Sequence, residues 1–98
     1  MTGEGARLVR ELHDAGTSTG TTACLVLAGG RFYRVSTMVC AEYPDIRQSV
    51  VFRTDANGWP ESWGRFIVLN GMDRDEAIRE LADRIDAKRR ELHGATAA

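Results

Sequence analysis

The alternation of apolar and polar positions predicts a run of β-strands through the middle of the chain. Residues 22–28 are apolar on both faces, a pattern that suits a central strand or a strand covered on both sides. The pair Gly29-Gly30 tolerates positive φ at both positions, so it predicts a tight hairpin into the next strand. Four strands are expected, over residues 22–28, 31–40, 46–54 and 65–70.

The first of two predicted helices covers residues 6–15, where Leu8, Val9 and Leu12 recur at helical spacing. Gly16 is well placed as the residue that follows the helix. Because a helix of about ten residues needs tertiary packing to persist, we expect this one to lie against the sheet.

The second predicted helix begins after Asp73, with Glu76 three residues further on, as in a capping box. Glycine commonly follows the last residue of a helix, so Gly94 predicts that this helix ends near His93 and leaves residues 94–98 as a disordered tail. Its apolar stripe consists of Ile78, Leu81, Ala82, Ile85 and Leu92.

These elements predict one α+β domain over residues 1–98, with the order αββββα. An antiparallel four-stranded meander would carry the N-terminal and C-terminal helices on one face. Asp55-Ala56-Asn57-Gly58 should form a turn before the fourth strand, because Asp caps its own turn and Asn-Gly accepts left-handed geometry.

The loop lengths also predict the strand register, with Cys24 opposite Val35 and Val35 opposite Val51. One face then carries Cys24, Val26, Tyr33, Val35, Val39 and Val51, and the other carries Leu25, Leu27, Phe32, Met38, Val50 and Phe52. Two helices cannot easily cover both faces. We therefore expect the second face to be buried against a partner, most simply a second copy in a two-fold dimer.

Composition narrows the classes of function. The 98 residues include 13 basic and 14 acidic side chains, a formal net charge of −1 that disfavours nucleic-acid binding. The longest apolar run, 23–28, is too short for a membrane span, and no secretory signal is visible at the N-terminus. Together with only two cysteines, these features predict a cytoplasmic protein without a membrane segment.

Candidate catalytic and metal-binding residues are scattered. Cys24, Cys40, His13 and His93 lack the close spacing of zinc ligands, and nothing indicates an activated cysteine–histidine pair. The Gly- and Thr-rich stretch 16–22 lacks the Lys of a phosphate-binding loop and precedes a strand rather than a helix. We expect no metal, no cofactor and no enzymatic activity.

Trp59 and Trp63 are the most informative pair, because they lie within five residues of each other in a connection that contains Pro60 and Gly64. Such tryptophans either anchor a loop onto the core or serve as contact residues at an interface. Tyr43, beside Pro44 in another loop, is a candidate to join them.

The end of the last helix is basic, through Arg84, Lys88, Arg89 and Arg90. Cations stabilise a helix C-terminus, and their long side chains shield apolar surface, which is sufficient explanation for the cluster. Phosphate or nucleic-acid binding at these four residues is the alternative.

Residues 49–58, followed by Glu61-Ser62-Trp63-Gly64, resemble a segment of small proteins from actinobacterial phages. Those proteins carry a strand of the type Thr-Met-Val-Phe, then Asp-x-x-Gly and a Trp, and residues 33–37 are similar to their preceding strand. The resemblance covers the middle third of the chain. It implies a phage or prophage origin and a host-directed or assembly interaction, and it brings no catalytic residues.

The sequence therefore predicts a non-enzymatic interaction or regulatory accessory protein. Its contact residues would be Trp59, Trp63 and Tyr43, and its partner a second copy or a host protein. The alternative is a nucleic-acid-binding module that uses the basic end of the last helix.

Overall fold

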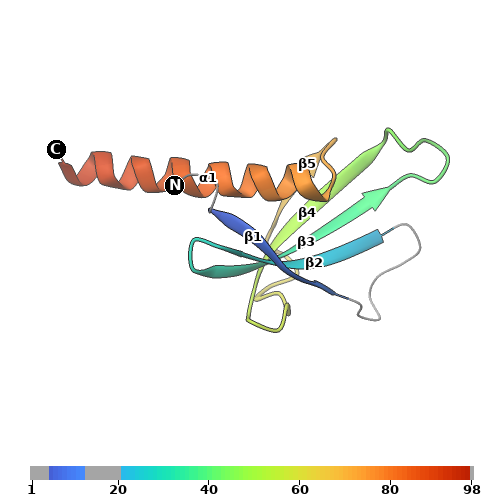
Figure 1. The fold of residues 1–98 in the computed structure, drawn as a ribbon, viewed down its shortest axis with the longest axis horizontal. Helices are drawn as coiled ribbons and strands as arrows, with labels where there is room; N and C mark the ends of the chain where they lie inside the picture. The colour runs from blue at the N-terminus through green and yellow to red at the C-terminus, as the bar shows by residue number, and fades with distance from the viewer. Residues whose placement is uncertain (1–4, 13–20, 98) are drawn as a thin grey trace.

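The computed structural model describes residues 5–12 and 21–97, with side chains as far as Leu92. The described residues form an antiparallel sheet and one long helix (Figure 1). The elements are β1 (Ala6–Leu12), β2 (Thr21–Ala28), β3 (Arg31–Val39), β4 (Arg47–Thr54), β5 (Phe66–Asn70) and α1 (Arg74–Ala97).

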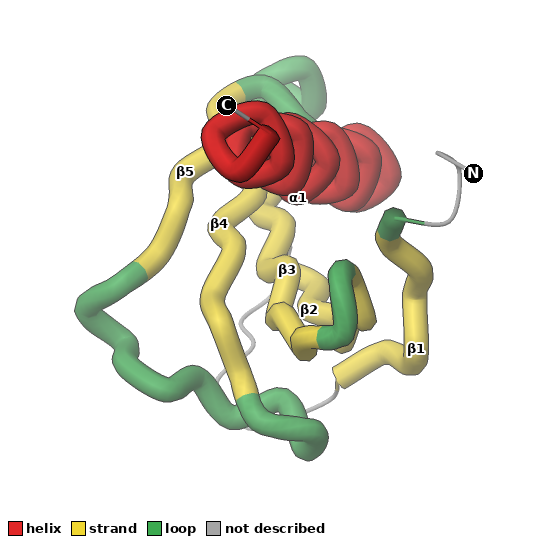
Figure 2. Tube along the Cα trace, turned by 90° about the vertical axis from the view of Figure 1, so that its left-hand side faces the viewer, coloured by secondary structure: helices red, strands yellow, loops and turns green. Residues whose placement is uncertain are grey.

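The strands lie in the sheet in chain order, β1-β2-β3-β4-β5, and α1 crosses one face of this meander (Figure 2). The α+β class is confirmed, but the sheet has five strands where four were predicted. The helix packs mainly over β1, β2 and β3. Its C-terminal half extends beyond the sheet (Figure 1).

The additional strand replaces the predicted N-terminal helix. Ala6–Leu12 pairs antiparallel with β2, with Leu8 opposite Val26 and Leu12 opposite Ala23. This pairing satisfies the outer N–H and C=O groups of a central, buried strand, which outweighs the weak helical tendency of a short segment. Residues 13–15 of the predicted helix, Gly16 and the Gly- and Thr-rich stretch as far as residue 20 lie outside the described residues.

The predicted hairpins and their register are confirmed. Cys24 lies opposite Val35, and Val35 opposite Val51. Gly29 and Gly30 adopt φ values of 59° and 78°, as the two-residue turn requires. Because side chains alternate along each strand, this register fixes which residues meet α1.

We call the side of the sheet under α1 the helix face. Its core is a buried apolar cluster to which α1 contributes Ala77 and Leu81. The sheet contributes Cys24, Val26, Ala28, Val35, Val51 and Leu69. The prediction that Cys24, Val26, Val35 and Val51 share a face is therefore confirmed.

The capping box at the start of α1 is confirmed. The Glu76 backbone N–H donates to Asp73 Oδ1 at 2.9 Å, and the Asp73 N–H donates to Glu76 Oε1 at 3.1 Å. The hydrogen bond from the Glu76 N–H holds the pKa of Asp73 below its usual value. Arg47 Nη2 also lies 3.0 Å from Glu76 Oε1, which ties the first turn to β4.

The predicted end of the helix was wrong. We expected a stop at Gly94, with the helix ending near His93, but α1 continues to Ala97. Gly94 lies within α1 instead of ending it. Glycine inside a helix costs only about 1 kcal/mol relative to alanine, which the flanking turns can offset. No described helix is both long enough and apolar enough to cross a membrane.

Candidate interaction surface

The second side of the sheet is covered by the connection between β4 and β5, residues 55–65, and we call it the loop face (Figure 2). The connection begins with the predicted Asp55–Gly58 turn. Asp55 Oδ1 accepts hydrogen bonds from the Asn57 N–H at 2.8 Å and the Trp59 N–H at 3.1 Å, and Gly58 has a φ of 90°. The turn sends the chain back across the sheet.

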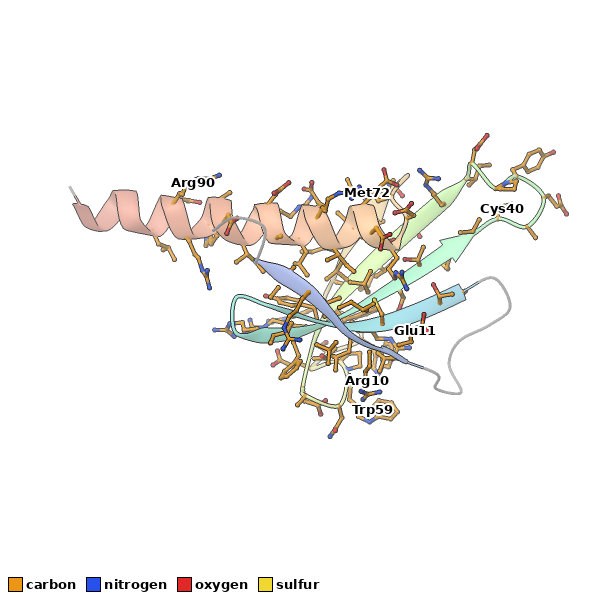
Figure 3. All side chains as sticks on the ribbon, in the orientation of Figure 1. Arg10, Glu11, Cys40, Trp59, Met72 and Arg90 are labelled. Atoms are coloured by element: carbon orange, nitrogen blue, oxygen red, sulfur yellow. The ribbon has the colours of Figure 1, made fainter. Side chains whose placement is uncertain are left out.

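This turn reaches as far as β1. A Cβ atom at Gly58 would lie 3.0 Å from Leu12 Cδ1, so only glycine allows this close approach. Arg10 Nη2 donates to the Asn57 carbonyl oxygen at 3.1 Å, and Figure 3 shows Arg10 on the same side of the sheet as Trp59. The loop thereby covers Leu12 and Leu25, which are buried.

Trp63 anchors the second half of this connection on the loop face. Its ring meets Phe52 edge-on, with centroids 5.3 Å apart and planes at 68°. The Arg34 guanidinium carbon lies 5.8 Å from the centroid of the Trp63 ring, close enough for a cation–π contact. Arg34 is only 4% exposed, and its Nε donates to Ser36 Oγ at 3.3 Å. Trp63 is therefore fixed from below while much of it faces solvent.

A group of large apolar side chains stays exposed beside this anchor. Phe66 contacts the same Phe52 ring, with centroids 5.6 Å apart. Val68 follows Phe66 by two residues on β5, so its side chain lies on the same face, and it pairs with Val50 of β4. We call this surface the aromatic patch; its members and exposed fractions are Trp63 58%, Phe66 52%, Met38 43% and Val68 41%.

The predicted interaction residues are separated in space. Trp59 and Trp63 both lie in the covering connection and are exposed, with Trp59 below the sheet in Figure 3. Tyr43 is exposed in the loop between β3 and β4, and Figure 3 shows Cys40, where this loop begins, far from Trp59. The structure thus keeps the two tryptophans on one side and places Tyr43 elsewhere.

Sequence reasoning missed Phe66 and Val68 as contact residues, although it placed Met38 and Phe52 on the second face. The missing information was the pairing of β5 with β4, which sets Phe66 beside Phe52. The expectation that this whole face needs a partner also requires correction. Leu25 and Phe52 are buried, and Trp63 of the connection contacts the Phe52 ring. Among the described apolar residues of this face, the aromatic patch and Trp59 stay exposed.

The basic residues at the end of α1 point in more than one direction. Arg84 Nε is paired with Glu80 Oε2 at 2.7 Å. A Cβ atom at Gly29 would lie 3.3 Å from Arg89 Nη2, so Arg89 faces the β2–β3 turn. Arg90 points away from the sheet (Figure 3), and Lys88 is exposed.

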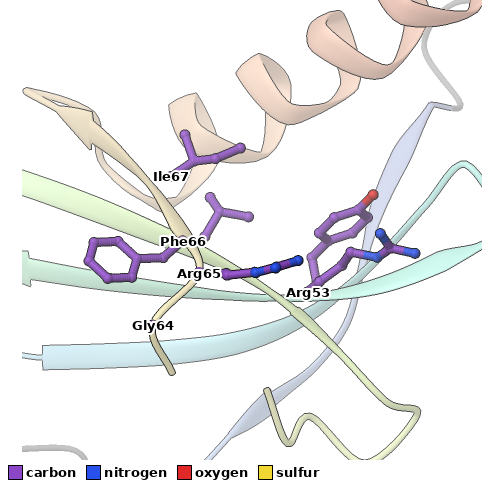
Figure 4. A pocket seen from close by; sticks show the side chains of 7 residues that line it. Arg53, Gly64, Arg65, Phe66 and Ile67 are labelled. Carbon is purple, nitrogen blue, oxygen red and sulfur yellow. The ribbon is translucent and has the colours of Figure 1, made fainter. Parts of the chain in front are cut away.

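A shallow hollow of about 430 Å³ lies beside β5 on the helix face, where α1 does not cover the sheet. Its lining includes Arg53, Arg65 and Ile67, and Figure 4 shows the side chain of Arg65 pointing toward Arg53. Arg53 Nε lies 3.7 Å from Glu61 Oε1 at the surface. The walls are largely apolar, and their chemistry does not define a reaction.

Cys24 is not an activated nucleophile. Cys24 is buried in β2, and burial raises the pKa of its thiol to about 11. Within residues 5–12 and 21–97, no three histidine, cysteine or acidic side chains are grouped to hold a metal ion. His13 lies outside this range.

Comparison with known proteins brings no further assignment: no family model, curated protein or solved structure matches the chain.

Proposed function

We propose that this domain is a non-enzymatic interaction module that binds another protein chain through the aromatic patch. The observation that carries the proposal is the exposure of Trp63, Phe66 and Val68 on the loop face, where Trp63 and Phe66 both contact the Phe52 ring and Val68 follows Phe66 on β5. Met38 is exposed on the same face, further along β3. Exposed apolar surface of this kind is typical of protein contact sites.

The construction of the patch supports binding. Trp63 is held by Phe52 and by Arg34, so little side-chain freedom is lost when a partner covers it. Tryptophan is also enriched among the residues that dominate binding energy at interfaces. Trp59, exposed in the same connection, extends the surface toward β1.

A photo-crosslinking amino acid placed at Met38 tests this assignment in cells that express the protein. We expect a protein adduct at this position, and we expect the adduct to be lost when Phe66→Ser is added. The same group at Arg90, on the exposed end of α1, is the matched control and should give no protein adduct. Adducts at position 90 but none at position 38 would refute the assignment.

Nucleic-acid binding by Arg84, Lys88, Arg89 and Arg90 is the second candidate, supported by the projection of the helix end beyond the sheet (Figure 1). It predicts binding to DNA or RNA that weakens steeply as salt rises. It ranks lower because Arg84 is already paired with Glu80, and because Arg89 faces the β2–β3 turn while Arg90 points away from the sheet. A phage or prophage origin and a cytoplasmic location remain proposals based on the sequence.

A further inference from the structure

The two edges of the sheet differ in how they are protected against pairing with another chain. β1 carries the charged residues Arg7, Arg10 and Glu11 and has an irregular register between Leu8 and Arg10, which leaves Val9 without an opposite residue. Charges and bulges are the usual devices that prevent a sheet edge from adding a strand. The β1 edge therefore has the features of a protected edge.

β5 has none of these devices. Its sequence Phe-Ile-Val-Leu-Asn contains no charge and no proline, and it pairs with β4 without any shift. Phe66, Ile67 and Val68 are exposed. No described strand pairs with its outer edge, and Figure 2 shows β5 at the margin of the molecule. A regular, uncharged apolar edge is a template for a further strand.

The hydrogen-bond pattern shows which groups of β5 are available. The Gly71 N–H donates to the Arg47 carbonyl oxygen at 2.8 Å, so this opposite pair is a hydrogen-bonded pair. Such pairs alternate along an antiparallel ladder, so Leu69 and Ile67 direct their main-chain groups toward β4. Phe66, Val68 and Asn70 direct theirs outward.

The β3–β4 side of the ladder gives the same alternation. There the Cys40 N–H donates to the Ile46 carbonyl oxygen at 2.9 Å, which makes Ser36–Val50 a hydrogen-bonded pair. Val50 therefore directs its main chain away from β5, and Val68 opposite it directs its own to the free edge. Three consecutive outward positions, each with an N–H and a C=O group, are thus open to a partner strand.

We propose that this edge pairs antiparallel with β5 of a second copy of the chain, about a two-fold axis that passes between the two Val68 residues. The inference rests on the proposed function, because the partner strand joins two aromatic patches into one surface. In this register Phe66 faces Asn70 of the partner, and Ile67 faces Leu69 of the partner. All three outward residues of each copy are then hydrogen bonded.

Repulsion between the Arg65 side chains favours this register over the one with the two-fold axis at Phe66. With the axis at Val68, Arg65 lies opposite Gly71 of the partner, and the two Arg65 residues are separated by roughly 20 Å along the strands. With the axis at Phe66, the two Arg65 residues would be diagonal neighbours at about 7 Å, which is repulsive. The two-fold axis perpendicular to the sheet also keeps both copies of α1 on one side.

A five-residue edge makes a small interface, so we expect self-association in the range of about 1 µM to about 1 mM. Sedimentation equilibrium of the full chain over this range should show a monomer–dimer equilibrium. Val68→Lys places two like charges at the axis and should weaken dimerisation at least about tenfold. Val9→Lys, at similar exposure on the β1 edge (39% against 41%), should leave it unchanged.

Cross-linking tests the register itself and does not depend on a strong dimer. In a Cys40→Ser background, Val68→Cys should form a disulfide-linked dimer under mild oxidation, because opposite Cα atoms in a hydrogen-bonded pair lie about 5.5 Å apart. Cys24 should not compete, since it is buried. Val9→Cys is the control on the other edge, and thermal unfolding confirms that each variant is folded.

These experiments test the register, the choice of edge and self-pairing separately. Faster cross-linking of Phe66→Cys than of Val68→Cys would overturn the register, and equal cross-linking at Val9→Cys would overturn the choice of edge. A chain that stays monomeric at about 1 mM, with no Val68→Cys dimer, would overturn self-pairing. The proposed function would survive that result if the Met38 cross-linker still captured a different protein, and it would fail if position 38 gave no adduct.

Discussion

The two faces of the sheet are covered by different kinds of structure. On the helix face, α1 buries a continuous aliphatic cluster from β2 through β5 with Ala77 and Leu81. On the loop face, residues 55–65 bury only part of the apolar surface, and an arginine lies within it. The comparison indicates that the helix face provides most of the stability. The loop face leaves large apolar side chains exposed, and these form the surface that we propose for binding.

Leu81→Ala should produce the largest effect, a loss of about 3 kcal/mol in the free energy of unfolding, because Leu81 is buried and its removal leaves a cavity. Leu92→Ala is the same substitution on the exposed end of α1 and should cost less than about 0.5 kcal/mol. Urea denaturation measures both. Equal small losses would mean that α1 does not stabilise the sheet.

Gly58→Ala should cost about 2 kcal/mol on the loop face. About half of this comes from a φ of 90°, and the rest from crowding against Leu12. Gly30→Ala shares the positive φ but meets nothing within 4 Å, so it should cost only about 1 kcal/mol. The difference between the two variants in chemical denaturation measures the contact between the turn and β1. No difference would show that this contact is loose.

Trp63→Ala should cost about 1.5 kcal/mol, because it removes the edge contact with Phe52 and the cation–π contact with Arg34. Trp59→Ala should cost about 0.5 kcal/mol, since its side chain is largely exposed. Thermal unfolding followed by circular dichroism compares the two. A larger loss for Trp59→Ala would reverse the roles assigned to the tryptophans.

Asp73→Asn should have the smallest effect and should depend on pH. The pKa of Asp73 in the folded chain is lowered from 3.8, mainly by the hydrogen bond from the Glu76 N–H. The ionised carboxylate therefore stabilises the fold above pH 3.8, and this contribution is lost as pH falls through the lowered pKa. Melting midpoints of wild type and Asp73→Asn should differ at neutral pH and converge in acid. A difference that persists in acid would contradict this origin.

The elements that were predicted correctly depend on local chemistry. The Gly29-Gly30 turn, the Asp55–Gly58 turn and the capping box at Asp73 and Glu76 each satisfy their own backbone groups within a few residues. The hairpin turns then fix the register of β2, β3 and β4, because side chains alternate strictly between faces. These features were readable without any knowledge of the tertiary structure.

The errors concern choices that depend on distant partners. Residues 6–12 have apolar spacing compatible with a helix, and only the unpaired edge of β2 decides that they form a strand. Gly94 is a common helix stop, yet α1 passes through it. Among the predicted contact residues, Trp63 lies in the aromatic patch and Tyr43 lies in the loop between β3 and β4.

The sequence by itself determined an antiparallel meander with apolar residues on both faces and a capped C-terminal helix, because alternation and turn chemistry act over short distances. Only the tertiary structure decided how those faces are covered. It assigned α1 to one face and residues 55–65 to the other, and it left β5 as an open, uncharged edge. Which segment covers each face, and which strand edge stays unpaired, depends on contacts between segments that are distant in the sequence. Those contacts are set by packing and not by local sequence.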